Sequence, residues 1–215
     1  MRTRLRRRQV LTTGAAVAAG TVLATGSAVA CRTTPATTLD VTRAESLGGD
    51  LAQVALLAAL DNAAVVAYDA MAERIGELRD DGTTVSEVVA DLLGATREHH
   101  RRHAEAWGRV LDGLGRGPVV ERDLTYGAEL EVAVNLAVTE RDLASTATGL
   151  ETVLAATGLA ALGALVDQAA LEAVATIQPV EAAHAALLAQ VAGAEPTPSV
   201  VLALAPARPL TDVLG

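Results

Sequence analysis

The chain has 215 residues, of which 51% are hydrophobic, enough to form a real core and too many for a disordered chain. Aromatic side chains are almost absent, with no Phe, two Tyr and one Trp, so Ala, Leu and Val must fill the core. Because Ala and Leu favour helices, this composition argues against an all-β fold and predicts an all-α one. The net charge of −9 makes nucleic acid and anionic lipid poor partners.

Residues 1–30 are typical of an export signal. The run at 7–11 (Arg-Arg-Gln-Val-Leu) matches the twin-arginine pattern, and an uncharged, weakly hydrophobic stretch follows it. Residues 28–30 (Ala-Val-Ala) before Cys31 fit both a signal-peptidase site and a lipobox. Cys31 is the only cysteine, so we expect it to be the lipidation site of a protein on the extracytoplasmic face of the membrane. The alternative is an incidental thiol that is removed with the signal.

The rest of the chain divides by composition into a tether, a helical domain and a tail. Residues 31–46 are small, polar and turn-forming, which is typical of a tether. Residues 193–215 contain four prolines, which disfavour a helix. Between them, 47–192 hold four stretches with helical periodicity, and Gly or Asp-Gly signals separate them. We expect helices at 47–79, 85–114, 128–156 and 159–191.

Four long helices predict a four-helix bundle. The short connections after the first and third helices predict two antiparallel hairpins. Residues 115–126, if extended, could reach nearly the length of a helix. A long crossover with parallel second and third helices is therefore expected.

Each predicted helix has an ionisable residue in the middle of its apolar face. Buried carboxylates need a partner or a cation, and carboxylates with imidazoles suit iron, manganese or zinc. Asp61, His100, Glu140 and Glu181 follow one another at nearly equal intervals along the chain, which also suggests two copies of one helical hairpin. The candidate metal ligands, in chain order, are Asp61, His100, His103, Glu140, Glu181 and His184.

Simpler interpretations exist for several of these residues. The run at 97–103 could be a solvated basic patch, and Asp61 could be a core acid paired with water. Glu140 is followed by Arg141 and Asp142, so it could belong to a surface cluster of ion pairs. Only the joint placement on four helices favours a metal site.

The segment Ile177-Gln178-Pro179-Val180-Glu181-Ala182-Ala183-His184, with Asp61 and Tyr68 in the first helix, resembles the ferritin-like superfamily. The similarity is to twin-arginine-exported bacterial ferritin-like proteins in particular. Their site takes a Glu from the first and third helices and Glu-x-x-His from the second and fourth. The resemblance implies a ferritin-like bundle with a crossover and the same six ligands named above.

Two ligand positions depart from that family pattern. His100 stands where the second helix should supply a bridging Glu, and Asp61 is shorter than Glu. Since His usually binds one metal ion, a mononuclear or vestigial site becomes an alternative to the dinuclear one.

The function expected from these features is that of an exported ferritin-like protein that binds iron, or manganese or zinc, and handles iron or oxidants. If it is an enzyme, we expect a metal-dependent oxidoreductase. The alternative is a metal-free bundle that acts as an envelope-anchored structural or partner-binding protein. The expected partners are a metal ion and the membrane, but no nucleic acid, and a homodimer stays open.

Overall fold

The computed structural model describes residues 36–196 and 206–208, and within these ranges every regular element is an α-helix. The predicted signal at 1–30 and Cys31 lie outside the described residues, as does most of the predicted tail. The all-α prediction is confirmed. The helices are α1 (Ala36–Asp80), α2 (Glu87–Gly113), α3 (Leu124–Leu136), α4 (Glu140–Leu162) and α5 (Gln168–Val191).

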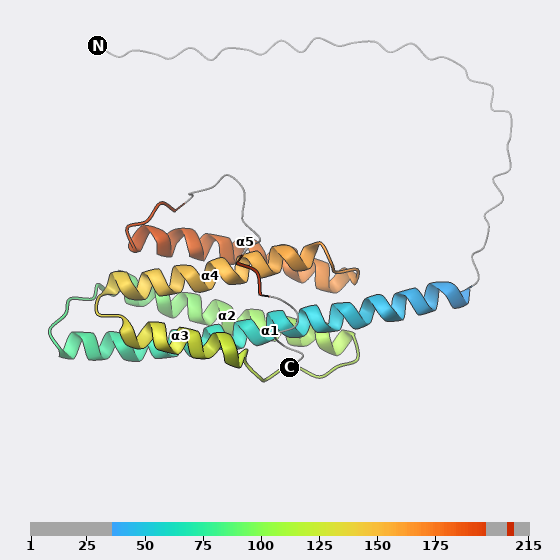
Figure 1. Ribbon diagram of the computed structural model, residues 1–215, viewed down its shortest axis with the longest axis horizontal. Coiled ribbons are helices and arrows are strands. Elements are labelled where there is room, and N and C mark those ends of the chain that lie inside the picture. Colours follow the sequence, from blue (N-terminus) through green and yellow to red (C-terminus); the bar gives the residue numbers. More distant parts are fainter. Residues whose placement is uncertain (1–35, 197–205, 209–215) are drawn as a thin grey trace, which may run out of the picture. The chain divides into compact units, whose positions relative to one another are not determined.

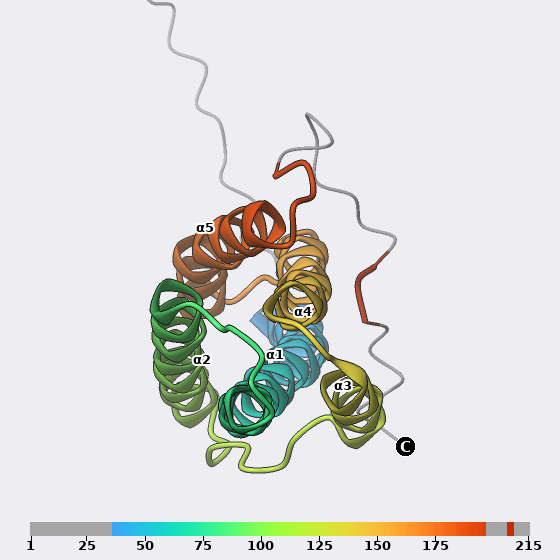
Figure 2. The ribbon, with the colours of Figure 1, turned by 90° about the vertical axis from the view of Figure 1, so that its left-hand side faces the viewer.

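Four of these helices form a bundle, and the short α3 lies outside it. Figure 2 shows α1, α2, α4 and α5 around a common centre, with α3 packed beside α1. Figure 1 shows that α1 and α2 form one hairpin and that α4 and α5 form another. The first hairpin turns at Gly82, whose φ of 83° suits glycine, as the sequence signal at 80–82 predicted.

The connection between the two hairpins runs back along the bundle. The backbone N–H of Ser86, just before α2, donates to Oε2 of Glu140, the first residue of α4, at 2.8 Å. The helices α2 and α4 therefore begin at the same end of the bundle and run parallel. This confirms the predicted crossover, but the connection spans 114–139 and contains α3, so it is longer than the expected 115–126.

The expected third and fourth helices were wrong at their boundaries. A break at 137–139 separates α3 from α4, because the side chain of Thr139 caps α4 by accepting from the N–H of Asp142 at 3.2 Å. The carboxylate of Asp142 in turn accepts from the N–H of Val138 at 3.1 Å, in the manner of a capping box. The expected break near Gly158 is absent, because α4 continues to Leu162.

Gly158 lies within α4 and faces α5 rather than ending a helix. A Cβ at this position would lie 3.4 Å from Cγ of Gln178 in α5, which is an ordinary contact distance. The other end of the helical domain also differs from expectation. The first helix begins at Ala36, inside the stretch 31–46 that was expected to be a turn-forming tether.

The core consists of two apolar clusters, one toward each end of the bundle. Buried polar and charged residues lie between the two clusters, at the level of Asp61 in α1. Residues 48–80 are long and apolar enough to cross a membrane by length and composition, but 67% of the most apolar window is buried within the bundle. We therefore interpret this segment as the central core helix. The largest fully buried apolar side chains are Trp107, Tyr68, Leu56, Leu60, Met71, Leu111, Leu143, Leu150, Leu188 and Val54.

The two hairpins are also joined by a buried carboxylate at the end opposite to Ser86. Asp50 of α1 is only 1% exposed, and its oxygens accept from the N–H of Val166 at 3.1 Å and of Asp167 at 2.6 Å. Asp167 is itself the N-cap of α5. Asp50 therefore fixes the turn between α4 and α5 against α1.

Replacing Asp50 should destabilise the protein strongly for a single residue. In Asp50→Ala the two amides lose their acceptor, and we expect a loss of about 1–3 kcal/mol in the free energy of unfolding. Asp50→Asn keeps one acceptor oxygen and should lose less. Urea denaturation followed by circular dichroism measures both. Equal stability of the Ala variant and the parent protein would contradict the role given to Asp50.

Candidate metal centre

Six buried ionisable residues meet in the middle of the bundle, between the two apolar clusters. Each of the four long helices contributes at least one, and none is more than 8% exposed. Residues three apart share one face of a helix, so α2 and α5 each present a pair inward. The six residues are Asp61 of α1, His100 and His103 of α2, Glu151 of α4, and Glu181 and His184 of α5.

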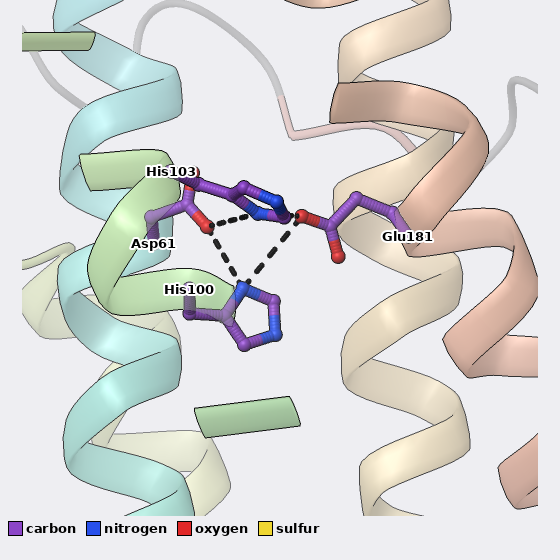
Figure 3. Close-up of side chains that lie close together, drawn as sticks. All are labelled: Asp61, His100, His103 and Glu181. Atoms are coloured by element: carbon purple, nitrogen blue, oxygen red, sulfur yellow. Dashed lines mark hydrogen bonds and ion pairs between the residues drawn. The ribbon is translucent and has the colours of Figure 1, made fainter. Parts of the chain in front are cut away.

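The first ligand group consists of Asp61, His100, His103 and Glu181, whose donor atoms all lie within 4.8 Å of one another. Figure 3 shows their polar atoms turned toward one another from α1, α2 and α5. Oδ1 of Asp61 lies 2.8 Å from Nδ1 of His100 and 3.6 Å from Nδ1 of His103. Oε1 of Glu181 lies 2.7 Å from Nδ1 of His103 and 3.7 Å from Nδ1 of His100.

The second ligand group consists of His100, Glu151, Glu181 and His184, and it meets the same 4.8 Å limit. Glu151 contacts both histidines: its Oε1 lies 2.9 Å from Nε2 of His100, and its Oε2 lies 3.1 Å from Nδ1 of His184. Oε2 of Glu181 lies 3.6 Å from the same nitrogen of His184. The two groups therefore share His100 and Glu181.

Five of the six predicted ligands are in these groups, and Glu140 is not. It is half-buried at the start of α4, where it accepts from the N–H of Ser86. The prediction was wrong because it placed Glu140 inside one long helix, whereas the chain breaks just before this residue. The sequence held the signal, since Thr139-Glu140-Arg141-Asp142 has the spacing of a capping box.

Glu151 supplies the carboxylate that was assigned to Glu140. Its position follows from the helical pattern of α4, in which Leu143, Leu150 and Leu154 are buried and Glu151 falls on the same side. Leu136, which a continuous helix would place on that face, is 73% exposed. Glu151 lies four residues after the buried Ala147 and three before Leu154, so the apolar face of α4 includes it.

Three further residues hold the ligands in place. The hydroxyl of Tyr68 donates to Oε1 of Glu151, and Nε1 of Trp107 donates to Oδ2 of Asp61 at 2.7 Å. Nδ1 of the exposed His99 lies 2.8 Å from Nε2 of His184. Such contacts orient ligand side chains and fix the protonated nitrogen of an imidazole. These three contacts join different helices, so the periodicity of a single helix does not indicate them.

The pKa shifts show how strongly the buried charges interact. Burial by itself would lower the pKa of His100, but Glu151, Glu181 and Asp61 outweigh it and raise that pKa well above its usual value. Burial would likewise raise the pKa of Glu151, but His100 and His184 hold it below its usual range. Burial and the neighbouring Glu151 raise the pKa of Tyr68, which keeps its hydroxyl protonated as a donor.

The donor atoms of Glu181 and His103 indicate room for a cation. Both oxygens of Glu181 and Nδ1 of His103 are buried, yet they have no hydrogen-bond partner among the described residues. Oε1 and Nδ1 are 2.7 Å apart without the geometry of a hydrogen bond. Neighbouring ligand atoms on one ion lie roughly 3.0–3.4 Å apart when metal–ligand bonds are about 2.0–2.2 Å long. The separations of 2.7–3.7 Å in the first group bracket this value, so the residues fit a metal ion.

A small cavity adjoins the first group. It has a volume of about 20 Å³, enough for about one water molecule. Asp61, Glu181 and Trp107 line one side, and the rest of the wall is mostly apolar.

Comparison with known proteins agrees with the geometry. The model of the ferritin-like domain family matches residues 26–194, which include every helix that contributes to the site. No curated protein and no solved structure gave a significant match. The family match covers most of the chain and agrees with the helical bundle of the structure. The chain belongs to the ferritin-like domain family.

Proposed function

We propose that this protein binds a transition-metal ion in the middle of its bundle, and that iron, manganese and zinc are the candidate ions. The observation that carries the proposal is that both oxygens of Glu181 and Nδ1 of His103 are buried without a hydrogen-bond partner among the described residues. Buried polar atoms without a hydrogen bond are costly, and a cation would satisfy them. Mixed carboxylate and imidazole donors suit these three metals.

The surrounding residues support a role in iron or oxidant handling. A bound redox-active ion would supply one-electron chemistry. Trp107 and Tyr68 would hold Asp61 and Glu151 in orientation, and the apolar bundle would exclude bulk water. The adjoining cavity would admit a molecule of about the size of water beside Asp61 and Glu181.

One observation favours a second candidate, a metal-free bundle with a structural or partner-binding role. Both ring nitrogens of His100 lie at hydrogen-bond distance from carboxylates, Asp61 at 2.8 Å and Glu151 at 2.9 Å. A doubly protonated His100 would satisfy both without any ion. Metal binding would then require that the imidazoles release protons, so it should weaken as pH falls.

The location of the protein in the cell is also a proposal, and it rests on the sequence of residues 7–11 and on Cys31. We propose export by the twin-arginine route, which moves folded proteins, and a lipid anchor at Cys31. Metabolic labelling with a radioactive fatty acid should mark the parent protein and leave Cys31→Ser unlabelled. An unlabelled parent protein would rule out the anchor.

Glu151→Gln should weaken metal binding by at least about tenfold, because it removes a charged ligand and keeps the volume of the side chain. Glu140→Gln makes the same chemical change in the same helix and should bind like the parent protein. The single tryptophan donates to Asp61, so quenching of its fluorescence by Co(II) or Fe(II) reports binding. Equal affinity of both variants would contradict the assignment of Glu151.

The same titration tests the proposed function in the parent protein. An ion at a hundredfold excess over its Kd should stabilise the fold by about 2.7 kcal/mol. If neither the fluorescence nor the melting temperature responds to Fe(II), Mn(II) or Zn(II), the metal-free candidate replaces the first.

The metal-free protein should become less stable as pH rises from about 6.5 to about 9. Burial would lower the pKa of His103, but contact with Asp61 and Glu181 raises it to about 9, against roughly 6.5 in the unfolded chain. A raised pKa stabilises the fold below the unfolded value, and this contribution is lost as pH passes the folded value. Urea denaturation in chelator should show a smaller loss in His103→Gln. Parallel pH profiles would contradict the predicted role of His103.

A further inference from the structure

His100 lies between the two ligand groups and faces both. Its Nδ1 is 2.8 Å from Asp61 and 3.7 Å from Glu181, while its Nε2 is 2.9 Å from Glu151. The side chain is fully buried, so neither nitrogen contacts solvent. The two nitrogens of one ring are therefore available to two different sets of ligands.

Glu181 is divided between the groups in the same way. Its Oε1 is 2.7 Å from His103 in the first group, and its Oε2 is 3.6 Å from His184 in the second. Each group thus has two imidazoles and two carboxylates, which is a complete set of four ligands for one ion. Neither oxygen of Glu181 has a hydrogen-bond partner among the described residues, so one oxygen is available to each ion.

We propose that His100 binds two divalent metal ions at once, one through each ring nitrogen, as a bridging imidazolate. Each ion takes the place of one ring proton, so two N–H bonds break, two metal–nitrogen bonds form, and the two protons pass to solvent without any change in oxidation state. The inference rests on the proposed function and adds the number of ions and the residue that joins them.

Charge balance supports two ions joined through His100. Asp61, Glu151, Glu181 and an imidazolate at His100 carry four negative charges, which two divalent ions neutralise. With a neutral His100, two ions would leave a net positive charge in a buried site, and one ion is balanced only when one of the three imidazoles stays doubly protonated. Uncompensated buried charge is costly, so when two ions bind, the imidazolate form of His100 is favoured.

The bridge also restricts the class of ion. His100 supplies a ring nitrogen to each ligand group, at the position where the family pattern has a bridging Glu. Such nitrogen ligands favour ions that accept imidazole readily, such as Cu(II), Zn(II) and Co(II). Two ions on opposite sides of one ring remain separate but are joined by its conjugated bonds. Paramagnetic ions bound in this way should therefore interact magnetically.

The test is a titration of the metal-free, full-length protein with Cu(II), followed by dialysis against a weak chelator. Metal content by mass spectrometry and the electron paramagnetic resonance signal are measured on the same samples. We expect two ions per chain, and we expect the signal to rise with the first ion and fall with the second because the pair is coupled. His100→Gln should bind the second ion more than about tenfold less tightly and show no coupling. Arg102→Gln, an exposed position on the same helix, is the matched control and should behave like the parent protein.

The outcomes separate this inference from the proposed function. Two ions with independent, additive signals would overturn the bridge at His100 and leave metal binding intact. Binding of a single ion by the parent protein would also overturn the bridge and leave metal binding intact. No retained ion of Cu(II), Zn(II) or Co(II) would overturn the bridge, and a lack of response to Fe(II), Mn(II) and Zn(II) as well would also overturn the proposed function. The measurements on the parent protein decide the question even if His100→Gln does not fold.

Discussion

Three carboxylates are buried in the middle of the bundle, where Glu181 has a donor atom within 4.8 Å of each of the other two, and the centre depends on how their charge is compensated. Asp61, Glu151 and Glu181 come from three helices, and each lies beside at least one imidazole of α2 or α5. Without compensation their repulsion and desolvation would oppose docking of the hairpins. Three arrangements are neutral: three protonated imidazoles without an ion, one divalent ion with one protonated imidazole, or two divalent ions with His100 as an imidazolate. Protons and metal ions therefore compete for the same donors.

The composition of the core is matched to this centre. With almost no aromatic residues, the core of the bundle consists mainly of Ala, Leu and Val. The single Trp and one of the two Tyr are both used at the site, where each donates to a ligand carboxylate. A buried Trp or Tyr needs a partner for its polar atom, and the ligand carboxylates provide one. The scarce aromatic side chains thus serve the polar centre as well as the core.

Sequence reasoning reached the fold and most of the site because both depend on helical periodicity. The stripes of α1, α2 and α5 placed Asp61, His103 and Glu181 correctly on inward faces. It failed at the crossover, where Thr139 ends the continuity between α3 and α4. The break puts Glu140 in the first turn of α4, next to Ser86, so the carboxylate of α4 that reaches the centre is Glu151 instead. The role of Trp107 depends on a contact between two helices, and periodicity within one helix holds no information about it.

The distribution of ligands between the hairpins has a consequence for the order of folding. The first group takes three residues from the α1–α2 hairpin and Glu181 from the other, and the second takes three from the α4–α5 hairpin and His100 from the first. Neither hairpin alone can assemble a complete group, so the site can close only after the two halves have docked. A bound ion would then act as a cross-link between halves of the chain, and its release would loosen their interface before either hairpin unravels.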